Sequence, residues 1–172
     1  MQGQYLMVLI GVLLMLTLAP GIASAATPNQ GVVLKGPVSH RAKLLSDGHA
    51  VAPPTAPPKV RRVIQFANQI RDTPYVWGGG HASFRSSGYD CSGSVSFALR
   101  GGQFIRKPLI SGQLTQWGKA GRGNWITVYT NATHAFMVVA GLRFDTRDGP
   151  GPRWHKSPGS RAGFVKRHPA TY

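Results

Sequence analysis

The sequence predicts one domain of mixed helices and short β-strands, and three observations support this fold class. The 172 residues suffice for one compact domain with a short extension, and they exclude two large domains. Hydrophobic residues make up 42% of the chain, while 22 glycines and 13 prolines indicate many loops around one core. Two apolar segments have helical features, and three later segments have the length and composition of strands.

Residues 1–25 are predicted to be a secretory signal peptide. They carry no charged side chain and include an apolar run from Leu6 to Ala19, followed by an Ala-x-Ala sequence that ends at Ala25. This run is too short to span a bilayer, and the small residues indicate cleavage after Ala25. The mature protein is therefore expected to be secreted or held in the cell wall, without stable insertion in the membrane.

Residues 26–58 are predicted to form a Pro/Ala-rich tether, because they contain six prolines and show no sustained helical or strand period. The folded domain is expected over residues 59–172. Its first element is an amphipathic helix from Val60 to Ile70, where apolar residues recur at steps of three and four. The helix should end before Pro74, because a proline disfavours helical backbone in the residue before it.

A glycine-rich loop follows from Tyr75 to Gly80. It lacks the Gly-Lys-Ser/Thr ending of a phosphate-binding loop. Three consecutive glycines instead predict that the backbone passes close to another element or to a ligand.

A second helix is predicted from Asp90 to Gly101, with Asp90 as its N-cap and Cys91 in its first turn. Three short strands are predicted at residues 125–129, 134–139 and 142–145, and a polar turn joins the first two.

Charge is strongly unbalanced, since 20 lysines and arginines face five acidic residues and the net charge is +15. A nucleic acid, an anionic membrane face or an anionic cell-wall polymer would each suit this balance. Trp and Tyr residues interleave with basic ones, as in some nucleic-acid-binding surfaces. The export signal and the lack of a known nucleic-acid-binding motif argue against a nucleic acid partner.

Cys91 is the only cysteine, so it cannot form an internal disulfide. A first-turn position favours the thiolate, whereas the charge of Asp90 opposes it, so a cationic partner is needed. Among six histidines, His134 is the favoured partner, because it begins an apolar strand that can present its ring to the sulfur. The alternatives are a buried Cys91 that only fills space and a histidine without function.

Three segments of the chain occur together in a known family. They are Tyr75-Val76-Trp77-Gly78-Gly79, then Gly88-Tyr89-Asp90-Cys91-Ser92-Gly93, and the apolar strand that begins at His134. In these segments the chain resembles the NlpC-type peptidoglycan endopeptidases. The related CHAP amidase and endopeptidase domain shares similar pieces. The resemblance implies a papain-like α+β fold, in which the nucleophile helix packs on a small antiparallel sheet, and it implies no cofactor or metal.

The resemblance also implies a catalytic set. Cys91 maps to the nucleophile and His134 to the base, and a third polar residue on the next strand orients the imidazole. Asp145 lies at about that position and could accept the imidazole N–H. His155 is the competing candidate, and Asp145 could also be an ordinary turn residue.

Three further residues map to positions near the substrate in this family: Tyr75, Asp90 and Ser92. For Asp90 and Ser92, capping of the helix is the alternative role. Two departures affect the cleft, since Ser94 follows the Asp-Cys-Ser-Gly segment and Gly123-Asn124-Trp125-Ile126 replaces the usual Pro-Gly-Asp-Leu turn. These departures leave undecided which peptide bond is cut.

The residues and the resemblance together predict a secreted cysteine peptidase that cuts stem peptides of peptidoglycan through a Cys91 thioester. The resemblance implies that the D-glutamyl to diamino acid bond is the one cut. Its expected partners are peptidoglycan and the anionic polymers of the wall, and no nucleic acid. The alternatives are an N-acetylmuramoyl-L-alanine amidase of CHAP type and a non-catalytic cationic wall-binding protein. A zinc hydrolase built from His81, His134 and His155 ranks lower, because no zinc-binding spacing is present.

Overall fold

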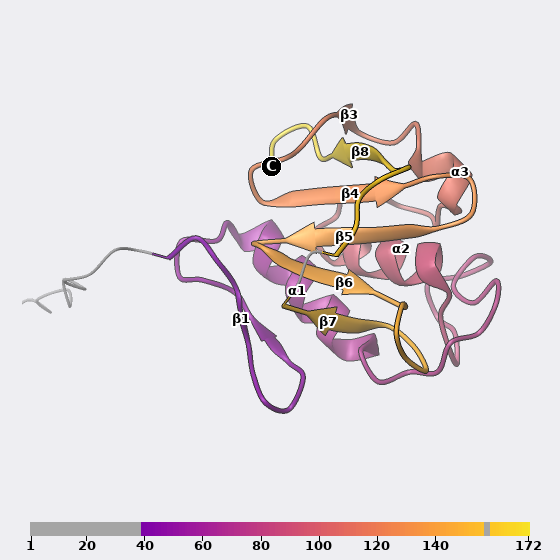
Figure 1. Cartoon of the computed structure of the whole chain (residues 1–172), viewed down its shortest axis with the longest axis horizontal. Helices are drawn as coiled ribbons and strands as arrows, with labels where there is room; N and C mark the ends of the chain where they lie inside the picture. Colours follow the sequence, from indigo (N-terminus) through magenta and orange to yellow (C-terminus); the bar gives the residue numbers. More distant parts are fainter. Residues whose placement is uncertain (1–38, 157–158) are drawn as a thin grey trace, which may run out of the picture. The chain divides into compact units, whose positions relative to one another are not determined.

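The computed structural model describes residues 39–156 and 159–172 (Figure 1). The predicted signal peptide and residues 26–38 of the predicted tether lie outside the described residues. In the part of the chain that is described, no helix combines the length and the apolar character needed to cross a membrane.

Among the described residues, six strands form one antiparallel sheet in the order β3-β8-β4-β5-β6-β7. The strands are β3 (Lys119–Ala120), β4 (Ile126–Thr130), β5 (Ala135–Val139), β6 (Leu142–Asp145), β7 (Arg153–His155) and β8 (Val165–His168). The three strands predicted from the sequence are confirmed as β4, β5 and β6 at the centre of the sheet. The sequence pattern missed β3, β7 and β8, which are short and partly exposed.

Two helices pack beside this sheet, α1 (Pro58–Ile70) and α2 (Cys91–Gly101), and a single turn forms α3 (Ser111–Leu114) (Figure 1). Helix α1 packs against α2, and α2 contacts β5 and β6. The predicted amphipathic helix is confirmed, because its apolar positions are the buried ones. These positions are Val60, Val63, Ile64, Ala67 and Ile70.

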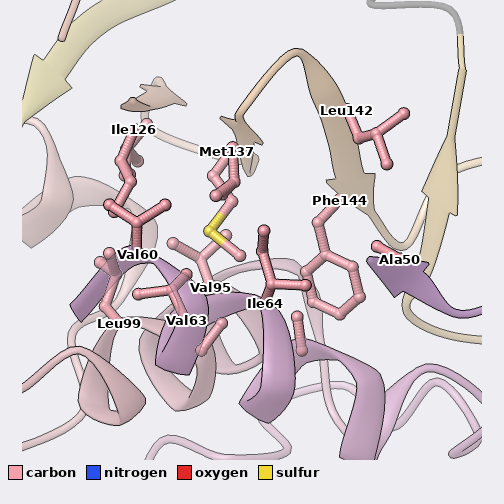
Figure 2. Packing of buried hydrophobic residues seen from close by; sticks show 14 of the residues in the cluster. Ala50, Val60, Val63, Ile64, Val95, Leu99, Ile126, Met137, Leu142 and Phe144 are labelled. Carbon is pink, nitrogen blue, oxygen red and sulfur yellow. The ribbon is translucent and has the colours of Figure 1, made fainter. Parts of the chain in front are cut away.

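The core lies between the helices and one face of the sheet (Figure 2). Met137 of β5 and Phe144 of β6 are register partners, and both are fully buried in this core. Side chains alternate between the two faces of a strand. The neighbours Phe136, Arg143 and Asp145 therefore lie on the opposite face of the sheet, and this alternation positions part of the site described below.

Residues 39–58, which the proline content places in an extended tether, pack on the domain instead. A two-stranded antiparallel ladder pairs β1 (Lys43–Leu44) with β2 (Ala50–Val51). Ala50 and Ala56 are buried, and the Ala42 N–H donates to the carbonyl of Ala140 at 2.8 Å. Small apolar residues between the prolines fill space against the core, so this segment belongs to the folded domain.

Candidate active site

Cys91 is placed by the start of α2. The Asp90 carboxylate caps the helix by accepting the Gly93 N–H at 2.7 Å, as predicted. The glycine-rich loop lies directly against this turn, because a Cβ atom at Gly93 would come within 2.0 Å of the Gly79 carbonyl oxygen. The predicted close approach of the loop is therefore confirmed, and it fixes the position of Cys91 at the junction of loop and helix.

The Cys91 side chain lines a cleft of about 430 Å³. Four segments form its wall: the glycine-rich loop, the first turn of α2, the start of α3 and the turn between β4 and β5. The lining residues are Tyr75, Trp77, His81, Asp90, Cys91, Ser92, Ile110, Ser111, Gly112, Ala132 and Thr133. Trp77 is 87% exposed and Tyr75 44% exposed, so the cleft offers apolar and aromatic surface to a ligand.

His134 is oriented by the turn between β4 and β5. The Asn131 side-chain oxygen accepts the backbone N–H of His134 at 2.9 Å and that of Thr133 at 3.0 Å. Such a side-chain turn fixes the backbone just before β5 begins. The same turn brings the Thr133 carbonyl oxygen to 4.0 Å from the Cys91 sulfur.

Asp145 binds the imidazole ring of His134 through Nε2. Its Oδ1 lies 3.0 Å from His134 Nε2, and the Asp145 side chain is fully buried. Its Oδ2 accepts Nε–H of Arg143 at 2.8 Å and a second N–H from the same guanidinium. The Arg143 guanidinium also lies over the Phe136 ring, 3.5 Å from its centroid. Asp145 therefore has a cationic partner that keeps it ionised while it binds His134.

The pKa of Cys91 is lowered and the pKa of His134 is raised, so both shifts favour the ionised form of the side chain. The hydrogen bond to Asp145 raises the pKa of His134 to about 9, with a further contribution from Cys91 and against the effect of burial. Burial raises the pKa of Cys91, but hydrogen bonds to His134, the Ala135 backbone and Ser111 outweigh it, so the net pKa is lowered. Burial likewise raises the pKa of Asp145, and His134 and Arg143 more than reverse this. The arrangement favours a thiolate next to an imidazolium.

His155, the competing third residue, lies on β7. Within the described residues it makes no hydrogen bond to His134, and its Nε2 atom is buried without a partner. Burial lowers its pKa, so the neutral ring is favoured. The structure thus brings Asp145, and not His155, to the His134 ring.

Three-dimensional comparison relates this arrangement to solved structures, whereas a scan of protein-family models and a search of curated proteins find no match. RipB of Mycobacterium tuberculosis, a peptidoglycan hydrolase, superposes with a TM-score of 0.54 and 23% identity over 66% of each chain. A variant of RipA, the resuscitation promoting factor interacting protein, gives a TM-score of 0.51 and 22% identity over 68% of this chain and 67% of that one. The chain has an NlpC/P60-type fold.

A third structure shows that a protein with this fold can be non-catalytic. RipD of Mycobacterium tuberculosis matches with a TM-score of 0.50 and 17% identity, over 66% of this chain and 98% of its own. It is described as a non-catalytic NlpC/P60 domain protein adapted to binding peptidoglycan. The NlpC/P60-type fold and its papain-like α+β architecture are thus shown for this chain.

Asp90 belongs to a second cluster at the same cleft of the NlpC/P60-type domain. Its Oδ1 accepts from Gly93 N–H and from the Ser92 hydroxyl at 3.2 Å, and its Oδ2 accepts from Gly78 N–H at 3.2 Å. His81 Nε2 lies 2.7 Å from the same Oδ2 and 3.0 Å from Ser92 Oγ. Both oxygens of Asp90 are therefore engaged by groups of the chain itself, and Ser92 is tied to the same network.

Three site residues escaped the sequence analysis: His81 as the partner of Asp90, Ser111 and Arg143. Arg143 had a usable signal, because it lies two residues before Asp145 on a predicted strand and so shares its face. Ser111 Oγ lies 3.7 Å from the Cys91 sulfur, but it comes from α3, a turn without a recognisable pattern. In the described part of the chain, no group of three His, Cys, Asp or Glu side chains is arranged to hold a metal ion.

Proposed function

We propose that this protein is a secreted cysteine peptidase that hydrolyses stem peptides of peptidoglycan. One observation carries the proposal: the buried Cys91 side chain lines a cleft, and His134, whose ring is held by the buried carboxylate of Asp145, lowers the pKa of the Cys91 thiol. The description of RipB as a peptidoglycan hydrolase supports the choice of substrate. Export rests on the signal peptide predicted at residues 1–25, and the D-glutamyl to diamino acid bond rests on the family resemblance.

Acylation begins with attack of the Cys91 thiolate on the carbonyl carbon of the scissile peptide bond. Because Nε2 of His134 is engaged by Asp145, Nδ1 is the nitrogen available on the Cys91 side, and its proton passes to the leaving amine. This step forms a thioester and releases the amine fragment. Water, deprotonated by the neutral His134, then attacks the thioester carbonyl, and the acid product and the thiol are released.

The developing oxyanion needs hydrogen-bond donors that are already in place. The backbone N–H of Cys91 lies in the first turn of α2, where helix N–H groups have no intrahelical acceptor. The Ser111 hydroxyl, 3.7 Å from the sulfur, is a second candidate donor. We assign Tyr75, Asp90 and Ser92 to the substrate-facing wall of the cleft. Tyr75 is suited to direct contact, while Asp90 acts through its network.

The main alternative is a non-catalytic cationic protein that binds the cell wall. The net charge of +15 and the description of RipD favour it. An amidase of CHAP type would use the same cysteine and histidine but would cut at the base of the stem. The peptidase and the amidase would release different fragments from the same substrate, and the binding protein would release none.

Digestion of purified peptidoglycan distinguishes the three functions. The exported protein, its Cys91→Ala variant and a His49→Ala control are incubated with the wall, and mass spectrometry identifies the released fragments. Cleavage within the stem by the wild type and the control, but not by Cys91→Ala, supports the peptidase. Release of intact stems indicates the amidase, and binding of all three proteins without any product indicates the wall-binding protein.

A second measurement does not require the correct substrate. Iodoacetamide alkylates thiolates, so its rate of reaction with Cys91 between pH 5 and 9 reports the ionisation of the thiol. A thiolate that persists below neutral pH supports the pair with His134. A profile equal to that of an unperturbed free thiol, with a pKa of about 8.5, would contradict the catalytic assignment.

A further inference from the structure

A groove of about 730 Å³ lies between α1 and the end of α2, apart from the cleft at Cys91. Four of its lining side chains are cationic: Lys59, Arg62, Arg100 and Arg106. Arg100 lies nine residues after Cys91, which places it about 14 Å along α2 from the nucleophile. The groove and the cleft share no lining residue.

Positive charge is distributed unevenly between the two hollows. Within the described part of the chain, no lysine or arginine lines the cleft at Cys91, whereas half of the residues that line the groove are lysine or arginine. The overall excess of basic residues does not by itself produce this contrast. The groove is therefore lined by lysine and arginine side chains, whereas the cleft is not.

In the part of the chain that the structure describes, no aspartate forms an ion pair with the cations of this groove. All five acidic residues are aspartates, and each forms an ion pair with a cation or a histidine elsewhere. In residues 39–156 and 159–172, none of the four groove cations takes part in an ion pair. An anion that balances them must come from another molecule.

Two of the four cations lie near aromatic rings at the edge of the groove. Arg100 lies over the Phe84 ring at 4.8 Å from its centroid, and Lys59 lies 5.7 Å from the centroid of Phe104.

We propose that this groove binds the phosphate groups of a linear anionic polymer. Three of its four cations are arginines, whose planar N–H groups match the oxygens of a phosphate. The cations extend from the first turn of α1 to the loop after α2, and the groove is far larger than one phosphate group. A polymer bound there would hold the domain on a phosphate-rich surface and leave the cleft free for another ligand.

The test measures binding of inorganic polyphosphate to three forms of the protein. One is the wild type, one carries Arg62→Gln and Arg100→Gln in the groove, and a control of equal charge carries Arg85→Gln and Arg122→Gln at exposed positions outside it. We expect the groove variant to lose about tenfold or more in affinity at 0.15 M salt and to show a shallower salt dependence. The control should lose less than about threefold.

Equal losses in the two double variants would overturn the proposal, because diffuse net charge would then explain the binding. Binding of the wild type to phosphatidylglycerol vesicles without binding to polyphosphate would overturn the choice of a polymer. Since a groove variant could fail to fold, a second measurement uses the wild type alone. Polyphosphate should protect Lys59 from acetylation more than the exposed Lys119, and equal protection would contradict the assignment.

The polyphosphate-binding measurements do not depend on the proposed peptidase activity. If Cys91→Ala abolishes cleavage and the groove variant still cleaves a short soluble stem peptide, the two sites are separate. If no form of the protein cleaves peptidoglycan, the polyphosphate measurements still decide the proposal for the groove.

Discussion

Two histidine–aspartate pairs belong to the candidate site around Cys91, and they differ in what surrounds them. His134 Nε2 lies 3.0 Å from Asp145, which is fully buried and also bound by Arg143. His81 Nε2 lies 2.7 Å from Asp90, which caps α2 and also accepts backbone N–H groups. Of the two rings, His134 contributes to the lowered pKa of Cys91. Both histidines are bound by an aspartate, so the aspartate alone does not identify the base. His134 is the candidate because it also acts on the Cys91 thiol.

Replacement of the two histidines should separate the pairs most strongly. His134→Ala removes the proton donor and the cation next to the thiolate, so we expect kcat/KM for a stem peptide to fall by about 10³-fold or more. His81→Ala leaves Cys91 and His134 in place and should cost far less. Equal losses in the two variants would contradict the assignment of His134 as the base.

Asp145→Asn should give the next largest effect, about 10²-fold in kcat, because an amide cannot stabilise the imidazolium as a carboxylate does. The hydrogen bond to Asp145 is the largest cause of the raised pKa of His134, which is about 9 in the wild type. Without the carboxylate, the ring loses its proton at lower pH. The alkaline limit of kcat/KM should therefore move from near pH 9 toward neutral pH, and an unchanged limit would argue against this pairing.

Arg143→Leu tests the buried arginine that binds Asp145 in the His134–Asp145 pair. Asp145 would stay buried with fewer donors, so we expect the free energy of unfolding to fall by about 3 kcal/mol in urea denaturation. Arg147→Leu is the matched control, because its ion pair with Asp148 is exposed. The control should change the free energy of unfolding by less than about 1 kcal/mol. Similar values for both variants would show that Arg143 does not stabilise Asp145.

His81→Ala itself should have the smallest effect. Asp90 keeps its bonds to Gly93, Gly78 and Ser92, so the start of α2 should stay formed. We expect kcat to change by less than about threefold and KM to change more, because His81 lines the cleft and its loss exposes the Asp90 carboxylate to the substrate. A fall in kcat as large as that of His134→Ala would show that both pairs act in the chemical step.

Several elements could be predicted because their signals are local. The cap at Asp90, the spacing of the apolar residues in α1 and the apolar runs of β4 to β6 each depend on neighbouring residues, and the structure confirms them. Packing of residues 39–58 escaped prediction, because alanines between prolines carry no periodic signal. The short strands β3, β7 and β8 form through pairing with distant partners, so their own residues do not identify them.

The sequence by itself determined that the one cysteine begins a helix and that a histidine begins an apolar strand, because caps and periodicity act over a few residues. Only the tertiary structure decided that Asp145, rather than His155, meets His134, and that Arg143 and Ser111 join the site. It also decided that four cations from two helices and a loop gather in one groove. Such contacts depend on the register of the sheet and on the packing of the helices, which bring together residues far apart in the chain.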